Sequence, residues 1–136
     1  MKILVTGGCG FIGSAIVRKL VKLGYHVLNL DKLTYAGHRE NVEEIAKRSN
    51  YEFASIDIGD KQAVEKYFDY FAPDAVIHLA AESHVDRSIG EPSGFITTNV
   101  VGTFNILEAS RLHWNRSGMS SGFRFLHVST DEVFGS

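Results

Sequence analysis

Residues 3–14 read ILVTGGCGFIGS, a short apolar run followed by glycines at positions 7, 10 and 13. The run at residues 3–5 is typical of a buried strand, and apolar residues at helical spacing follow the third glycine. Glycines between a strand and a helix let backbone N–H groups approach a pyrophosphate, which the positive end of the helix dipole also attracts. The stretch predicts a dinucleotide-binding loop at Gly7, Gly10 and Gly13, with an ordinary structural turn as the alternative.

Outward from this loop, apolar runs alternate with amphipathic stretches along the whole chain. Strands are expected at residues 3–5, 26–30, 51–56, 75–79 and 123–128, and helices at residues 12–23, 41–48, 60–72 and 92–114. Parallel strands need crossover connections, which these helices supply. The alternation predicts an α/β fold, a Rossmann-like doubly wound parallel sheet of five strands with helices on both faces.

Apolar stripes predict which helix faces are buried. In the first helix the stripe is Ile12, Ile16, Leu20 and Leu23. In the last it is Ile96, Val100, Thr103, Phe104, Leu107 and Leu112. The segment at residues 41–48 is a weaker helix, with Val42, Ile45 and Ala46 inward and a possible Glu44–Arg48 pair.

Composition excludes several classes of protein. The 136 residues are 44% hydrophobic and carry a net charge of −2 without a basic cluster, which argues against nucleic-acid and membrane partners. No apolar run reaches about 18 residues, so no spanning helix is expected. The single cysteine, Cys9, cannot form an internal disulfide, which fits the cytoplasm.

The length fits one domain, residues 1–136. A doubly wound domain normally continues beyond a fifth strand. We therefore expect this chain to be the N-terminal segment of a longer protein, truncated before the last strands of the sheet.

Asp31 ends the second expected strand. A carboxylate at this place accepts hydrogen bonds from the adenosine ribose and repels a 2′-phosphate, which favours NAD over NADP. The neighbouring bases Lys32 and Arg39 weaken this argument, because a base can accommodate that phosphate. A surface aspartate without a cofactor role is the alternative.

Six stretches make the chain similar to a known family. They are ILVTGGCGFIGS (3–14), LDKLTYAG (30–37), DI (57–58), HLAAESHVDRS (78–88), TNVVGT (98–103) and STDEVFG (129–135). With them the chain resembles the extended short-chain dehydrogenase/reductase superfamily and, within it, the dTDP-glucose 4,6-dehydratases. The resemblance implies NAD as cofactor, dTDP-glucose as substrate, a role in dTDP-rhamnose synthesis and a homodimer for the full-length protein. It also implies that the chain is the N-terminal segment of a longer enzyme, truncated before a sugar-binding domain.

The resemblance also implies which residues bind the cofactor. The pyrophosphate loop adds Phe11 and Ile12 to the glycines. The remaining positions are Asp31, Lys32, Leu33 and Thr34 at the ribose, Asp57 and Ile58 at the adenine, and Leu79, Ala80, Ala81, Glu82, Ser83 and Thr98 toward the nicotinamide. Without the resemblance, Ala80 and Ala81 suit close helix packing, and Thr98 and Asn99 suit hydrogen bonding on a helix face.

Thr130, Asp131 and Glu132 directly follow the fifth expected strand, where ligands bind in such sheets. On their own, two adjacent acids are typical of a solvated turn. The resemblance implies that Asp131 protonates the departing C6 hydroxyl of the sugar, that Glu132 removes the C5 proton, and that Thr130 and Ser83 contact the substrate. His78, His84 and His127 lack the spacing of metal ligands, so no metal is expected. Cys9 suggests either close packing or a reactive thiol.

Two departures from the family pattern stand out. Phe134 replaces the tyrosine of the usual STDEVYG, and none of the five tyrosines has a lysine four residues later. The superfamily uses such a Tyr-x-x-x-Lys pair to deprotonate the C4 hydroxyl, so these 136 residues alone are expected to be inactive. A nucleotide-sugar epimerase, which would lack the Asp131–Glu132 pair, and a non-catalytic dinucleotide-binding module remain as alternatives.

Overall fold

The computed structural model describes residues 1–83, 89, 90 and 92–135. The strands are β1 (Lys2–Thr6), β2 (His26–Asp31), β3 (Tyr51–Ser55), β4 (Ala75–His78) and β5 (Arg124–His127). The helices are α1 (Phe11–Lys22), η1 (Arg39–Ile45), α2 (Lys61–Phe71), α4 (Pro92–Phe95), η2 (Ile96–Gly102), α5 (Thr103–Arg116) and η3 (Asp131–Phe134). The α/β alternation predicted from the sequence is confirmed.

All strand pairs are parallel, and the sheet order is β3-β2-β1-β4-β5. The central strand β1 pairs Leu4 with Leu28 of β2 on one side and with Val76 of β4 on the other. The chain thus starts in the middle of the sheet, runs outward to β3, and returns across β1 to β4 and β5. This reversal makes the sheet doubly wound, as predicted, and leaves a crevice at the carboxyl ends of β1 and β4.

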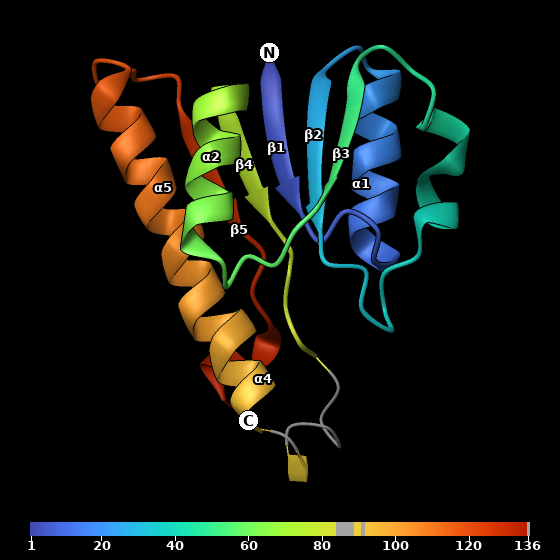
Figure 1. Cartoon of the computed structure of the whole chain (residues 1–136), viewed down its shortest axis with the longest axis vertical. Coiled ribbons are helices and arrows are strands. Elements are labelled where there is room, and N and C mark those ends of the chain that lie inside the picture. Colours follow the sequence, from blue (N-terminus) through green and yellow to red (C-terminus); the bar gives the residue numbers. More distant parts are fainter. Residues whose placement is uncertain (84–88, 91, 136) are drawn as a thin grey trace.

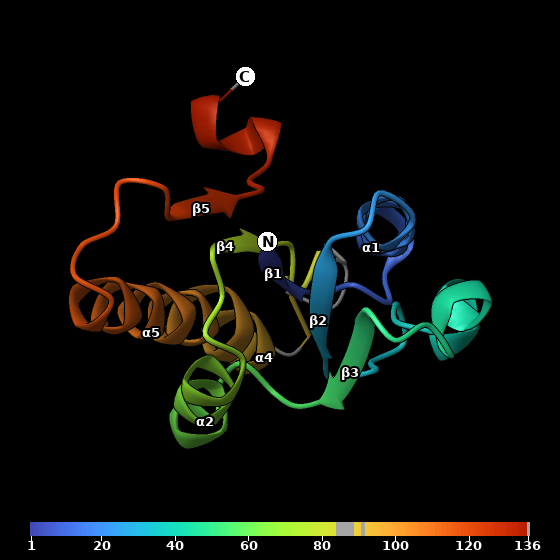
Figure 2. The same cartoon turned by 90° about the horizontal axis from the view of Figure 1, so that it is seen from above.

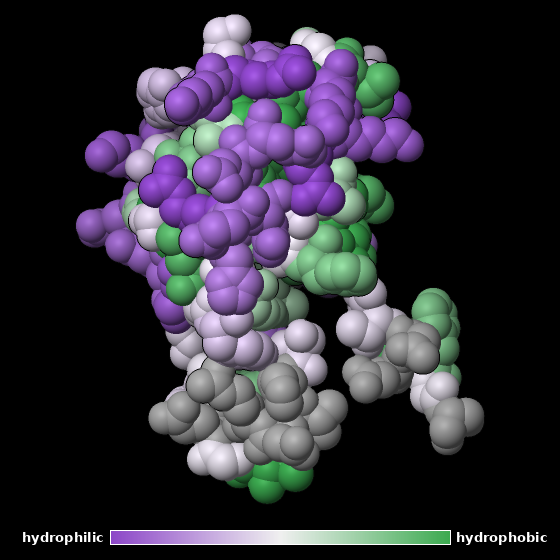
Figure 3. All heavy atoms as spheres, turned by 90° about the vertical axis from the view of Figure 1, so that its right-hand side faces the viewer, coloured by the Kyte–Doolittle hydropathy of each residue, from purple (hydrophilic) through white to green (hydrophobic). Residues whose placement is uncertain are grey.

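Helices cover both faces of the sheet. In Figures 1 and 2, α1 and η1 lie on one face, while α2, α4 and α5 lie on the other. From the side that carries α1 and η1, hydrophilic side chains cover much of the upper part of the molecule (Figure 3). No helix in the described part of the chain is long and apolar enough to cross a membrane.

Each face of the sheet has its own core. Leu4, Leu28 and Val76 belong to the core beneath α2 and α5, together with Phe68 and Ile106. Alternate residues of the same strands point the other way. That second core contains Ile3, Val5, Val17, Val21, Val27, Val42 and Ile45.

The buried face of α1 differs from the predicted stripe. Gly13, Ser14, Val17 and Val21 are buried, whereas Ile12 and Leu23 are 58% and 63% exposed. The cause is a close approach at the start of the helix: a Cβ on Gly13 would lie 2.1 Å from the carbonyl oxygen of Gly7. Residues in helical register with Gly13 therefore face the sheet.

The long helix formed by α4, η2 and α5 also buries a different face from the predicted one. Asn105, Ile106, Ala109 and Ser110 are buried, whereas Phe104 and Leu107 of the predicted stripe are 60% and 46% exposed. Polar residues are buried here because they find partners. The side-chain amide of Asn105 donates to the carbonyl oxygens of Ile58 and Gly59 at 2.9 and 3.1 Å. The helix is continuous from Pro92, but a π-helical segment, η2, interrupts the α-helical hydrogen bonding.

The segment at residues 41–48 is a 3₁₀ helix shifted toward the N-terminus, η1. Val42 and Ile45, three residues apart, are buried as predicted, because a 3₁₀ helix has three residues per turn. The prediction for Ala46 was wrong, since this residue is exposed. Glu44 pairs with Arg18 and Lys22 of α1, at 3.2 and 3.0 Å.

The start and end of α2 follow the sequence signals. The Asp60 carboxylate accepts a hydrogen bond from the N–H of Ala63 at 3.1 Å and caps the helix. Ala72 then adopts a left-handed conformation before Pro73 and ends it.

Candidate functional site

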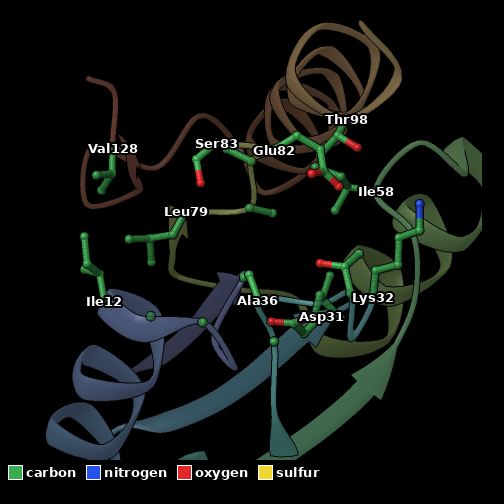
Figure 4. Close-up of a pocket in the computed structure, with 18 of the residues that line it drawn as sticks. Ile12, Asp31, Lys32, Ala36, Ile58, Leu79, Glu82, Ser83, Thr98 and Val128 are labelled. Carbon is green, nitrogen blue, oxygen red and sulfur yellow. The ribbon is translucent and has the colours of Figure 1, made fainter. Parts of the chain in front are cut away.

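A pocket lies at the carboxyl ends of the strands, between the start of α1 and the segments that follow β2, β3, β4 and β5 (Figure 4). Its lining includes almost every residue predicted to bind the cofactor. These are Gly7, Gly10, Phe11, Ile12, Gly13, Asp31, Lys32, Thr34, Asp57, Ile58, Leu79, Ala80, Ala81, Glu82, Ser83 and Thr98. Leu33 is not among the lining residues, and its side chain packs against the core beneath α1.

The glycine loop is held close to the turn after β4. Gly7 has a φ of 71°, and a Cβ there would lie 2.8 Å from the backbone nitrogen of Ala80. The N–H of Gly10 donates to the carbonyl oxygen of Gly7 at 3.2 Å, which tightens the loop. The result is a backbone surface without bulky side chains at the start of α1, the arrangement that a pyrophosphate requires.

Asp31 connects the glycine loop with the segment that follows β2. One carboxylate oxygen accepts the N–H of Cys9 in the glycine loop, and the other accepts the N–H of Leu33 after β2, both at 2.8 Å. Each carboxylate oxygen has a second lone pair, so these bonds leave acceptor capacity for ribose hydroxyls. Asp31 therefore shapes the loop in addition to its predicted contact with the ribose.

Lys32 and Asp57 form an ion pair in the lining, with the ammonium nitrogen 2.7 Å from a carboxylate oxygen. The other oxygen of Asp57 accepts the N–H of Gly59 at 2.8 Å. Burial raises the pKa of Asp57, but the bonds from Lys32 and the Gly59 N–H outweigh it and leave the pKa below its usual value. The carboxylate is therefore charged at neutral pH.

A buried hydrogen-bonded group fixes the turn after β4. The Thr6 hydroxyl accepts the N–H groups of Leu79 and Ala80 at 3.2 and 3.1 Å. Its own proton must then be donated to Nδ1 of His78, 2.6 Å away, so Nε2 carries the ring proton and donates to the Thr103 hydroxyl at 2.9 Å. Burial, and secondarily the nearby His127, lower the pKa of His78 to about 4 and keep the ring neutral.

Asn99 holds the next part of the pocket wall. Its side chain accepts the N–H of Glu82 at 2.8 Å and donates to the carbonyl oxygen of the same residue at 2.9 Å. Asn99 lies in the π-helical segment η2, which also carries Thr98 into the lining. Widened helical turns of this kind occur frequently at functional sites.

The predicted catalytic segment follows β5 at the rim of the pocket. Thr130 is a lining residue, together with Val128 and Ser129. In Figure 4, Val128 and Ser83 lie in the upper part of the pocket, above Ile12 at the start of α1. The backbone of Asp131 and Glu132 opens η3, but their side chains and the whole of His84 lie outside the described part of the structure.

Cys9 has the properties of a packing residue. It is fully buried, and burial together with the charge of Asp31 raises the pKa of its thiol to about 11. A protonated, inaccessible thiol is a poor nucleophile. Within the described residues, no group of three or more His, Cys, Asp or Glu side chains could hold a metal ion.

Sequence reasoning missed two kinds of site residue. The first are further lining residues: Leu30, Ala36, Gly37, Ile56, Val128 and Ser129. The second are Thr6 and Asn99, which shape the pocket through contacts with backbone groups. Asn99 stands beside the predicted Thr98, but Thr6 has no motif of its own beyond its place at the end of a strand.

The sequence model of the family described as GDP-mannose 4,6 dehydratase matches residues 4–136. A dTDP-glucose 4,6-dehydratase of Neisseria meningitidis is 55% identical over 98% of this chain, and one of Escherichia coli K12 is 54% identical over 99%. The chain spans 39% and 38% of the lengths of these relatives.

Solved structures of two related activities have the same fold. A dTDP-glucose 4,6-dehydratase of Streptomyces venezuelae, solved with NAD bound, is 44% identical, with a TM-score of 0.85 over 100% of this chain and 41% of that one. A UDP-glucose 4-epimerase of Thermotoga maritima is 37% identical, with a TM-score of 0.82 over 96% and 38%. Because the family match runs through nearly the whole sequence, the chain belongs to the GDP-mannose 4,6 dehydratase family.

Proposed function

We propose that residues 1–136 form the NAD-binding Rossmann domain, or most of it, of a dTDP-glucose 4,6-dehydratase. The observation that carries the proposal is the pocket in which the glycine loop, Asp31 and Asp57 meet the Thr130 segment after β5. The glycine-lined wall fits a pyrophosphate, and the Asp31 carboxylate fits a ribose. The curated relatives with this name, above half identical to the chain, support the same substrate class.

The proposed reaction oxidises C4 of the glucose ring, eliminates water across C5 and C6, and reduces C6, giving dTDP-4-keto-6-deoxyglucose. NAD supplies the redox chemistry by accepting a hydride from C4 and returning it to C6. Oxidation at C4 acidifies the C5 proton, which Glu132 removes and returns to C5 when the hydride is added to C6. Asp131 donates a proton to the departing C6 hydroxyl, while Thr130 and Ser83 hydrogen-bond the sugar.

Three finer proposals accompany this function. We assign the enzyme to dTDP-rhamnose synthesis and to the cytoplasm, where the unpaired Cys9 remains reduced. We also propose a homodimer of the full-length protein. The helix formed by η2 and α5 has an exposed apolar surface that a second subunit would cover. This surface consists of the side chains of Ile96, Val100, Phe104 and Leu107.

Cofactor binding can be tested on the 136-residue chain itself. We expect calorimetry to detect saturable binding of NAD, and we expect weaker binding when Asp31 is replaced by Ala. A chain that is folded by circular dichroism but binds no NAD would contradict the proposal.

The chemistry must be tested in a polypeptide that contains both this segment and the Tyr-x-x-x-Lys pair. Glu132→Gln should slow exchange of the C5 proton with solvent by about 10²–10⁴-fold, the usual contribution of a general base, while C4 oxidation, seen as transient NADH absorbance, continues. Asp131→Asn should slow elimination by a similar factor without blocking C5 exchange. Wild-type C5 exchange in Glu132→Gln would remove the proposed base.

A nucleotide-sugar 4-epimerase is the second candidate, because the Thermotoga maritima enzyme of that activity has nearly the same fold. The two activities give different products from one substrate. Mass spectrometry separates them, because elimination releases water from the sugar whereas epimerisation leaves its mass unchanged.

A further inference from the structure

The end of the pocket proposed to bind adenosine contains a lysine, Lys32, whose positive charge should favour NADP over NAD. Lys32 directly follows Asp31, and a base at this place commonly binds the 2′-phosphate of NADP. Arg39 is a second base close in sequence. If Lys32 and Arg39 were free to bind a 2′-phosphate, Asp31 alone would have to exclude NADP. The contacts of these two side chains therefore bear on cofactor selectivity.

Both cations have partners within the protein. The ammonium of Lys32 is bound to the Asp57 carboxylate at 2.7 Å, and in Figure 4 the Lys32 side chain extends away from Asp31. The guanidinium of Arg39 lies over the ring of Phe53, with its central carbon 4.6 Å from the ring centroid. Both positive charges are therefore engaged by groups of the protein.

The acceptor that holds Lys32 is itself fixed. The second oxygen of Asp57 accepts the N–H of Gly59 at 2.8 Å, which sets the orientation of the carboxylate. Asp31 and Asp57 contribute two carboxylates to the pocket lining and Lys32 contributes one ammonium, so the formal charge of these three groups together is negative. A phosphate entering this region would have to displace Asp57 from Lys32 and approach both carboxylates.

We propose that the Lys32–Asp57 ion pair is a second determinant of NAD over NADP selectivity, which acts by withholding the Lys32 ammonium from a ribose 2′-phosphate. This inference rests on the proposed binding of NAD. It differs from the role of Asp31, which accepts ribose hydroxyls directly. Asp57 thus has two functions, because it also lines the predicted adenine region of the pocket.

The test is a double-mutant cycle on the 136-residue chain, with NAD and NADP dissociation constants measured by calorimetry or competition at one ionic strength. Asp57→Asn frees Lys32 and should improve the affinity for NADP relative to NAD by about tenfold or more, the scale of one strong ion pair. Lys32→Gln should not improve it. In the Lys32→Gln background, Asp57→Asn should lose most of its effect, because no ammonium remains to bind the phosphate.

Asp69→Asn is the matched control. Asp69 also pairs with a base, Arg116, at 2.9 Å, but neither residue lines the pocket, so this variant changes net charge equally without freeing a cation there. Its NADP to NAD ratio should equal that of the wild type. The NADP affinity of Asp57→Asn should also fall steeply with added salt, since a new ion pair with phosphate is screened.

The outcomes separate the two proposals. A wild-type chain that binds neither dinucleotide contradicts the proposed function. Binding of NAD with an NADP to NAD ratio that Asp57→Asn leaves unchanged, or improves equally with and without Lys32, overturns the role of the ion pair alone.

Discussion

The proton positions around Thr6 follow from the number of hydrogen bonds that its hydroxyl makes. Two backbone N–H groups donate to this oxygen, so His78 must accept at Nδ1 and carry its proton on Nε2. A protonated ring would have a proton on both nitrogens and could no longer accept from Thr6. The turn that forms the floor of the pocket thus depends on a neutral histidine.

This arrangement predicts a pH dependence of stability. The unfolded chain binds a proton at His78 near pH 6.5 but the folded chain only near pH 4, so the free energy of unfolding should fall as pH drops through this window. The full loss, reached at about pH 4, is on the order of 3 kcal/mol. Urea unfolding at pH 7, 5.5 and 4.5 measures it. A His78 ring that titrates near pH 6.5 by NMR would contradict the assignment.

At the residue scale, the predictable members of the site were those that stand directly after a strand. Asp31, Asp57 and Thr130 reach the pocket because the carboxyl ends of parallel strands share one edge. Asn99 and Thr6 act by binding backbone groups far away in sequence, at Glu82 and at Leu79 and Ala80. Such contacts form only when the chain has folded, so the spacing of residues in the sequence does not predict them.

At the scale of elements, the positions of helices were predictable but their rotation was not. The spacing of apolar residues locates a helix in the sequence. Which side of the helix packs against the sheet is decided by the closest contact that the helix makes there. In α1 that contact is Gly13 against the Gly7 carbonyl, and in α5 it is the bond of Asn105 to the backbone after β3. Both select small or polar residues, which an apolar stripe cannot reveal.

The two glycines at the start of α1 should therefore respond differently to the same substitution. A Cβ on Gly10 meets only the Gly7 carbonyl oxygen, at an acceptable 3.4 Å, so Gly10→Ala should fold normally and lose NAD affinity because its methyl group enters the pocket wall. A Cβ on Gly13 would lie 2.1 Å from the same oxygen, so Gly13→Ala should lower the free energy of unfolding by about 1–3 kcal/mol despite alanine's higher helix propensity.

Calorimetry with NAD and urea unfolding separate these two effects. Equal loss of stability in both variants would show that the loop, and not the cofactor, requires Gly10. Unchanged NAD affinity in Gly10→Ala would remove this residue from the pyrophosphate site.

At the scale of the whole molecule, the alternation of strands and helices was enough to predict a doubly wound parallel sheet. The unequal burial of that sheet was not predictable from the apolar runs. Residues 123–128 are as apolar as the other strand segments, yet Leu126 is 54% exposed and Val128 39% exposed. β5 lies at the edge, with β4 as its only neighbour in the sheet, whereas β1 has neighbours on both sides.

This asymmetry predicts the pattern of hydrogen exchange in the 136-residue chain. Amides of β1 lie between two strands and two cores, so they should exchange only through global unfolding. Amides of β5 bond to one neighbour at most, beneath exposed side chains, so local opening should expose them at least about tenfold faster. Exchange followed by mass spectrometry on peptides from residues 2–6 and 124–130 measures both.

Added NAD should slow exchange in the peptide of residues 124–130, because Val128 to Thr130 line the pocket. The peptide of residues 2–6 should change less, because its amides already exchange only through global unfolding. Equal rates in the two peptides without cofactor would mean that the edge strand is as stable as the centre, and that its exposure carries no energetic cost.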